Sequence, residues 1–154
     1  MNLSTHVAVG AAVGYLCKNP ALGFCAGIIS HHLIDGIPHS DGGALEVDVK
    51  DYAKDKRIVK VVTADLLLVA AIICYILYLQ GFSWPIVLGA FGAVLPDLID
   101  NMPFWSPQIR KTHLGYLYHR FHEKFHYTIK EKSLFWTGIV NQFILIAISL
   151  RILV

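Results

Sequence analysis

The chain has 154 residues, of which 55% are hydrophobic and only 16% are charged. Soluble domains normally carry about a quarter of charged residues, so this composition argues against an ordinary water-soluble surface and predicts a single integral membrane domain over residues 1–154. A formal net charge of +2, with no basic stripe interleaved with aromatic residues, excludes nucleic acid as the expected partner.

The N-terminal part contains two apolar stretches, Val7–Cys17 and Ala21–Ile34, separated by Lys18-Asn19-Pro20. Each is shorter than the roughly 20 residues that a membrane-spanning helix needs. They are therefore either two short spans or a re-entrant hairpin. In both cases the chain returns to the side from which it started.

Longer apolar stretches follow at Ile58–Gln80 and Leu134–Val154, each about 20 residues and long enough to cross a bilayer. Pro85–Ile99 is shorter and would span together with its flanks. A polar stretch at 101–132 is rich in histidine, lysine and aromatic residues. The predicted fold is all-α: a polytopic membrane helix bundle of about five apolar helices plus a His-rich amphipathic helix.

Small residues recur four positions apart within the apolar stretches, a spacing that lets helices approach closely in lipid. The pairs are Gly10 with Gly14, Gly23 with Gly27, and Gly89 with Ala93. Together they predict a tightly packed bundle.

The basic residues predict the orientation. Five crossings, or three plus a hairpin, place the N-terminus and the polar stretches 39–57 and 101–132 on one side. Eleven of the 13 lysines and arginines fall there, all except Lys18 and Arg151. By the positive-inside rule this side is cytoplasmic, so we expect a multi-pass protein of the cytoplasmic membrane with a cytoplasmic N-terminus.

All eight histidines map to the same side, close to aspartates at the ends of the apolar stretches. Imidazole and carboxylate together suit zinc, with manganese or iron as alternatives, better than magnesium or calcium. His31 and Asp35 share a helix face at a spacing of four, and His119, His122 and His126 form one helical stripe. The predicted metal ligands are His6, His31, Asp35, His39, Asp97, Asp100, His122 and His126.

A faint internal repeat relates 27–35 to 92–100. It aligns Asp35 with Asp100 and His32 with Asp97. Paired helix ends of this kind can converge on one centre, so the repeat predicts that acids of the two segments share a metal site.

The segments Ser-Thr-His6, Ser30-His31-xxx-Asp35-Gly-Ile-Pro-His39 and Leu95-Pro96-Asp97 resemble the small membrane-bound metal-dependent hydrolases of bacteria and archaea. That family includes a LexA-regulated inner-membrane member and is related to zinc-dependent phospholipase C. The resemblance implicates His6, His31, Asp35, Asp97 and His119. It departs from the family pattern at Asp100, which lies one residue later than the second acid of L-P-D-x-D, and in the late cluster His-Arg-Phe-His-Glu.

These observations predict a metal-dependent hydrolase acting on a phosphoester at the cytoplasmic membrane boundary, with membrane lipids as partners and a phospholipid or lipid-linked phosphate as substrate. The metal would activate a water molecule. His119 or His122 would act as ligand or general acid, and Arg120 would stabilise phosphate charge.

Two other functions use the same residues. A divalent-metal carrier would need a polar path through the bilayer, for which the long apolar stretches offer few polar side chains. His122-Glu123-Lys124-Phe125-His126 reads HExxH, the helix motif of zinc metalloproteases. A membrane metalloprotease is therefore a further alternative.

Overall fold

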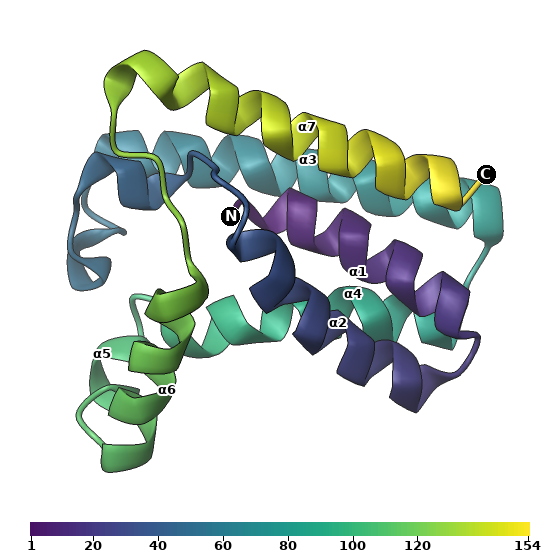
Figure 1. The fold of residues 1–154 in the computed structure, drawn as a ribbon, viewed down its shortest axis with the longest axis horizontal. Coiled ribbons are helices and arrows are strands. Elements are labelled where there is room, and N and C mark those ends of the chain that lie inside the picture. The colour runs from purple at the N-terminus through teal and green to yellow at the C-terminus, as the bar shows by residue number, and fades with distance from the viewer.

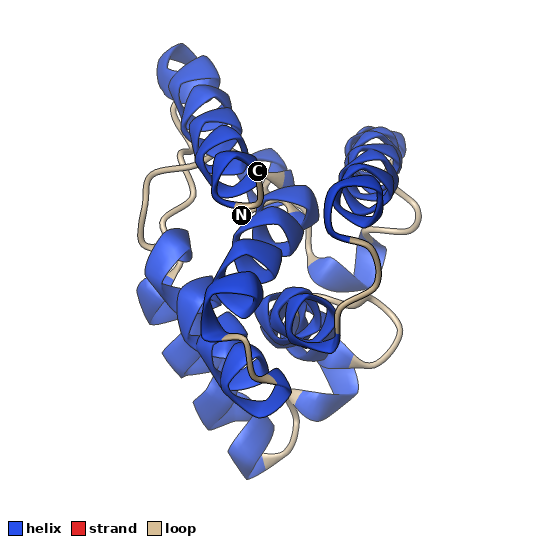
Figure 2. Ribbon diagram, turned by 90° about the vertical axis from the view of Figure 1, so that its right-hand side faces the viewer, coloured by secondary structure: helices blue, strands red, loops and turns tan.

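The computed structural model describes all 154 residues and is all-helical, as predicted. Figure 2 shows helices joined by loops, with no strands. The α-helices are α1 (Leu3–Cys17), α2 (Pro20–Asp35), α3 (Lys56–Gln80), α4 (Trp84–Asp100), α5 (Ser106–Ile109), α6 (His113–Phe125) and α7 (Phe135–Ile152). Short 3-10 turns are η1 (Gly42–Leu45), η2 (Val49–Asp51) and η3 (Lys132–Leu134).

Side-chain caps define where several helices begin. The Asn19 side chain accepts a hydrogen bond from the Leu22 amide, and Pro20 follows at the first helical position of α2. Asp55 caps α3, and Thr112 caps α6. Such caps satisfy amides that have no partner within the helix, so the boundaries follow from local sequence.

Helices α1, α2 and α4 form a compact unit because glycines bring their backbones together. A Cβ at Gly10 would lie 2.5 Å from the Gly89 carbonyl oxygen, and one at Gly27 or Gly14 would collide with backbone oxygens of α4. The predicted small-residue faces are therefore confirmed as the helix crossings.

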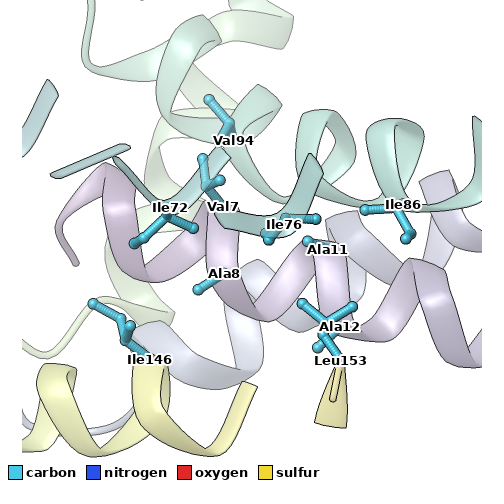
Figure 3. Packing of buried hydrophobic residues seen from close by; sticks show 10 residues of the cluster. All are labelled: Val7, Ala8, Ala11, Ala12, Ile72, Ile76, Ile86, Val94, Ile146 and Leu153. Carbon is cyan, nitrogen blue, oxygen red and sulfur yellow. The ribbon is translucent and has the colours of Figure 1, made fainter. Parts of the chain in front are cut away.

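Helix α1 is the centre of the hydrophobic core. Figure 3 shows Val7, Ala8, Ala11 and Ala12 of α1 among apolar side chains from three other helices. Those side chains are Ile72 and Ile76 of α3, Ile86 and Val94 of α4, Ile146 of α7, and Leu153 directly after α7. Every apolar helix except α2 thus contributes to the cluster around α1.

The expected number of membrane-spanning helices is wrong by the criterion of length. Two helices are long and apolar enough to cross a membrane, the 25-residue α3 and the 21 residues of η3 and α7, instead of about five. Helices α1, α2 and α4 have 15, 16 and 17 residues. At 1.5 Å per residue they reach at most about 26 Å, less than the roughly 30 Å hydrocarbon core.

The polar segments gather at one end of the molecule. Figure 1 shows residue 1, the loop after α2 and the segment carrying α5 and α6 at the end opposite the C-terminus. The tight turns after α1 and α3 lie at the far end, where Gln80 donates a hydrogen bond to the Leu153 carbonyl. Helices α1 and α2 form an antiparallel hairpin, so the N-terminal segments do return to the starting end.

Candidate metal centre

Histidines and aspartates from four helices and two loops converge at this polar end. The inner residues are almost completely buried, although all are polar. The converging residues are His6 of α1, His31 and Asp35 of α2, Asp97 and Asp100 of α4, His119 and His122 of α6, and His39, Asp41 and His126 beside them.

Hydrogen bonds fix the orientation of His31 and His122. Nδ1 of His31 donates to the Ala93 carbonyl oxygen at 2.8 Å, and Nδ1 of His122 donates to Asp100 at 2.9 Å. When its ring is neutral, each histidine therefore presents an Nε2 lone pair, and the two Nε2 atoms lie 3.0 Å apart. Two facing acceptors repel each other unless a proton or cation lies between them.

The distances around this pair fit a single small cation. Two donors bound to one zinc ion at 2.0–2.1 Å in tetrahedral geometry are roughly 3.3 Å apart. Nε2 of His31 lies 3.2 Å from Asp35 Oδ2, and Nε2 of His122 lies 3.6 Å from both Asp35 Oδ2 and Asp97 Oδ1. His31, Asp35, Asp97 and His122 thus form a four-ligand group.

A second group, formed by Asp35, His39 and His126, shares Asp35 with the first. His39 donates from Nδ1 to the Ile37 carbonyl, which directs its Nε2 toward Nε2 of His126 at 3.0 Å. Oδ2 of Asp41 lies 3.0 Å from His39 and 3.2 Å from His126. The α-amino group of Met1 also lies here, 2.8 Å from Asp35 and 3.2 Å from Asp41.

Backbone pairing holds the two loops of the second group together. The Tyr127 amide donates to the Asp35 carbonyl at 2.8 Å, and the Ile129 amide donates to the His39 carbonyl at 2.7 Å. His39 and Thr128 form an isolated parallel β-bridge. This pairing positions His126 beside the end of α2.

Several buried polar atoms at the centre lack a hydrogen-bond partner. They are both ring nitrogens of His6, Nδ1 of His32 and Oδ2 of Asp35. His6 stacks on His31 with ring centroids 4.1 Å apart, and its Nε2 lies 3.2 Å from Asp35 Oδ1 without hydrogen-bond alignment. Because an unsatisfied buried polar group costs about 1–3 kcal/mol, these atoms fit a site for a divalent metal ion.

Asp100 lies behind His122 and orients it. Its Oδ2 accepts hydrogen bonds from Nδ1 of both His119 and His122 at 2.9 Å, and its Oδ1 accepts one from Arg110 at 2.9 Å. A carboxylate that fixes the far nitrogen of a ligating histidine is a common outer partner of metal sites. The acid grouped with Asp35 is Asp97, whereas Asp100 belongs to a separate group with His119 and Glu123 that could also hold a metal ion.

Charges shift the pKa of two groups in this region. Burial opposes the charged form of His122, but hydrogen bonds to Asp100 and Asp35 and the charge of Asp97 raise its pKa to about 9. Burial likewise disfavours the Asp41 carboxylate, yet the Met1 amino group, His126 and His39 hold the pKa of Asp41 well below its usual range. The centre thus favours cations next to its carboxylates.

The role predicted for Arg120 needs correction. Arg120 is exposed and makes no hydrogen bond or ion pair with the cluster, because it lies off the face of α6 that carries His119 and His122. The arginine that reaches the cluster is Arg110, through Asp100. Asp65 of α3 accepts hydrogen bonds from the Leu3 and Ser4 amides at the start of α1.

The HExxH segment does not form one continuous helix. Helix α6 ends at Phe125, and His126 has an extended backbone with φ −99° and ψ 109°. His122 and His126 consequently belong to different ligand groups. Asp41, whose position beside His39 is its only signal in the sequence, was missing from the predicted ligand set.

No protein-family model matches the chain, and no significant match exists among curated proteins or solved structures. The resemblance to the membrane-bound hydrolase family therefore rests on short sequence motifs alone.

Proposed function

We propose that the chain is a membrane-embedded, metal-dependent hydrolase acting on a phosphoester of a lipid or lipid-linked phosphate. The observation that carries the proposal is the pair of ligand groups sharing Asp35, with His31 and His122 held so that their Nε2 atoms face each other at 3.0 Å. Zinc fits this nitrogen and carboxylate donor set, and manganese or iron are alternatives.

His31, Asp35, Asp97 and His122 would hold a first ion, with His6 beside them. His39 and His126, together with Asp35 and the neighbouring Asp41, would hold a second. A divalent ion at such a site supplies Lewis acidity, which activates water and polarises a phosphoryl oxygen. His119 is partly exposed and its Nδ1 lies 2.9 Å from Asp100, and it would move a proton at the edge of the site.

The membrane setting is supported by the surfaces of α3 and α7. Of their most apolar stretches only 11% and 22% is buried within the protein. Large side chains such as Leu67, Tyr78, Trp136 and Phe143 are well exposed. Surfaces of this extent are stable in lipid rather than in water. A site at the polar end of these helices would lie at headgroup depth, on the cytoplasmic side.

Metal content and turnover test the reaction class. Asp35→Asn and Asp97→Asn should each remove most of the bound metal found by elemental analysis of detergent-purified protein, and turnover of a phosphoester with it. Glu123→Gln should leave metal content and phosphoesterase activity unchanged, since Glu123 belongs to neither ligand group that contains Asp35. Full metal occupancy with activity lost in Glu123→Gln would instead favour the protease.

Membrane sidedness is tested by cysteine labelling in a background without Cys17, Cys25 and Cys74. Cysteines at Lys54 and Lys130 should be shielded from an impermeant thiol reagent in intact cells, whereas a cysteine at Ser83 should react. Reaction at Lys130 from outside would reverse the orientation of every proposed ligand.

A further inference from the structure

Two grooves lie along α3 and α4, and the larger one begins beside the His/Asp cluster. The larger, about 740 Å³, is lined at its polar end by Asp97, His126 and Asp41 and further along by Ile58, Val62 and Leu66. The smaller, about 340 Å³, is almost wholly apolar and includes Val69, Ile73, Leu77, Val87 and Phe91.

The two grooves lie end to end along α3 and α4. Leu3 lines both of them. Figure 3 shows Val7 of α1, Ile76 of α3 and Ile86 of α4, and these three residues line the smaller groove. The lining therefore changes from charged to fully apolar with distance from the ligands.

We infer that this path binds one hydrocarbon chain of a lipid whose phosphate lies at the His/Asp cluster. The inference rests on the proposed function and adds the mode in which the lipid is recognised. A polar opening at the cluster followed by an apolar path matches the polarity of a phospholipid or other long-chain phosphoester, and not that of a soluble phosphate ester.

The path is long enough for a single chain. From Ile58 to Leu77 the α3 lining of the two grooves extends roughly 28 Å at 1.5 Å per residue. This is close to the roughly 30 Å thickness of the hydrocarbon core. Helix α3 packs on α1 and η1, so the groove between α3 and α4 is not closed by direct packing of these two helices.

Photolabelling tests the path without relying on turnover. The probe is hexadecylphosphonate with a diazirine near the end of its chain, added to zinc-loaded protein in nanodiscs. A phosphoesterase does not cleave its P–C bond, so the probe stays intact whether or not the protein is active. The same diazirine on hexadecanol, which lacks the phosphonate, is the matched probe for bulk lipid. We expect the phosphonate probe to label residues 69–77 of α3 and 86–94 of α4, and the alcohol to label them at least about tenfold less, because a charged headgroup bond contributes well over one decade of affinity.

Neighbouring residues on α3 provide the variants. Leu66 lines the groove, whereas Leu67 is more exposed and lines neither groove. Leu66→Trp should reduce labelling about tenfold, the effect of displacing about two buried methylene groups, and Leu67→Trp should leave it unchanged. Ile73→Trp blocks the smaller groove and is the second variant, should Leu66→Trp not fold.

Equal labelling by the alcohol, or wild-type labelling in both Leu66→Trp and Ile73→Trp, would overturn the inference. Turnover of the soluble ester p-nitrophenyl phosphate is measured on the same samples. Hydrolysis without groove labelling rejects the chain site and retains the hydrolase. Stronger labelling by the probe with the charged headgroup than by the alcohol, without hydrolysis of p-nitrophenyl phosphate, supports the chain site and rejects the hydrolase.

Discussion

The α1/α2/α4 unit and the long helix α3 are both apolar in sequence, yet they are built for different surroundings. Nine of the 15 residues of α1 are buried, whereas only three of the 25 residues of α3 are. In the unit, glycines bring backbone against backbone, so α1, α2 and α4 lie close together. Helix α3 contacts the unit along one face and exposes the rest. Hydrophobicity alone therefore does not distinguish a helix packed among other helices from one that exposes its apolar side chains; the small residues do.

The largest effect is expected from a substitution that disrupts the packing of α1, α2 and α4. A Cβ at Gly27 would collide with the Gly89 carbonyl oxygen and lie 2.9 Å from the Ala93 backbone nitrogen. Gly27→Ala should destabilise the fold by about 1–3 kcal/mol or more, because backbone atoms cannot rotate away. Leu67→Ala on the exposed face of α3 should change stability by less than about 0.5 kcal/mol. Thermal unfolding in detergent measures both, and equal losses would contradict the comparison.

A smaller effect is expected one layer outside the ligands. Asp100→Asn keeps the shape of the side chain but removes the charge that His122, His119 and Arg110 contact. Metal affinity should fall by about 10–100-fold, less than the loss expected for Asp35→Asn. Competition with a chelator of known affinity measures this, with the exposed His113→Gln as control. A loss as complete as in Asp35→Asn would make Asp100 a direct ligand.

The smallest effect concerns the polar contact that joins α3 to the unit. Asp65 accepts hydrogen bonds from the first amides of α1 at 2.7 and 3.2 Å. Asp65→Ala should cost about 0.5–2 kcal/mol, the usual contribution of a helix cap. Asp51→Ala, which removes an exposed pair with Lys54, should be close to neutral. If the two variants unfold at the same temperature, Asp65 does not couple the regions.

The sequence was sufficient to predict the convergence of histidines and aspartates, because apolar stretches of alternating direction bring helix ends to the same place. His6, His31, Asp35 and Asp97 were all identified in this way. The sequence could not show which of Asp97 and Asp100 lies nearer Asp35, because residues three apart share a helix face. Only the position of α6 decides this. The same holds for Arg110 and Arg120.

The number of membrane-spanning helices was predicted wrongly for a different reason. Apolar composition was read as contact with lipid, but in α1 and α4 it is contact with other helices. Lengths of 15 to 17 residues already carried this information. Asp41 was missed because a loop position has no periodicity that indicates its direction.

The backbone pairing of Asp35 and His39 with Tyr127 and Ile129 has a consequence for the order of folding. These partners are about 90 residues apart in the chain, and contacts of such long range form slowly because a large loop must close first. During synthesis, the hairpin of α1 and α2 can form well before His122 and His126 have been made. Closure of the bridge between His39 and Thr128 would thus be a late event. Any ion that needs both His39 and His126 would therefore bind only after this last step of assembly.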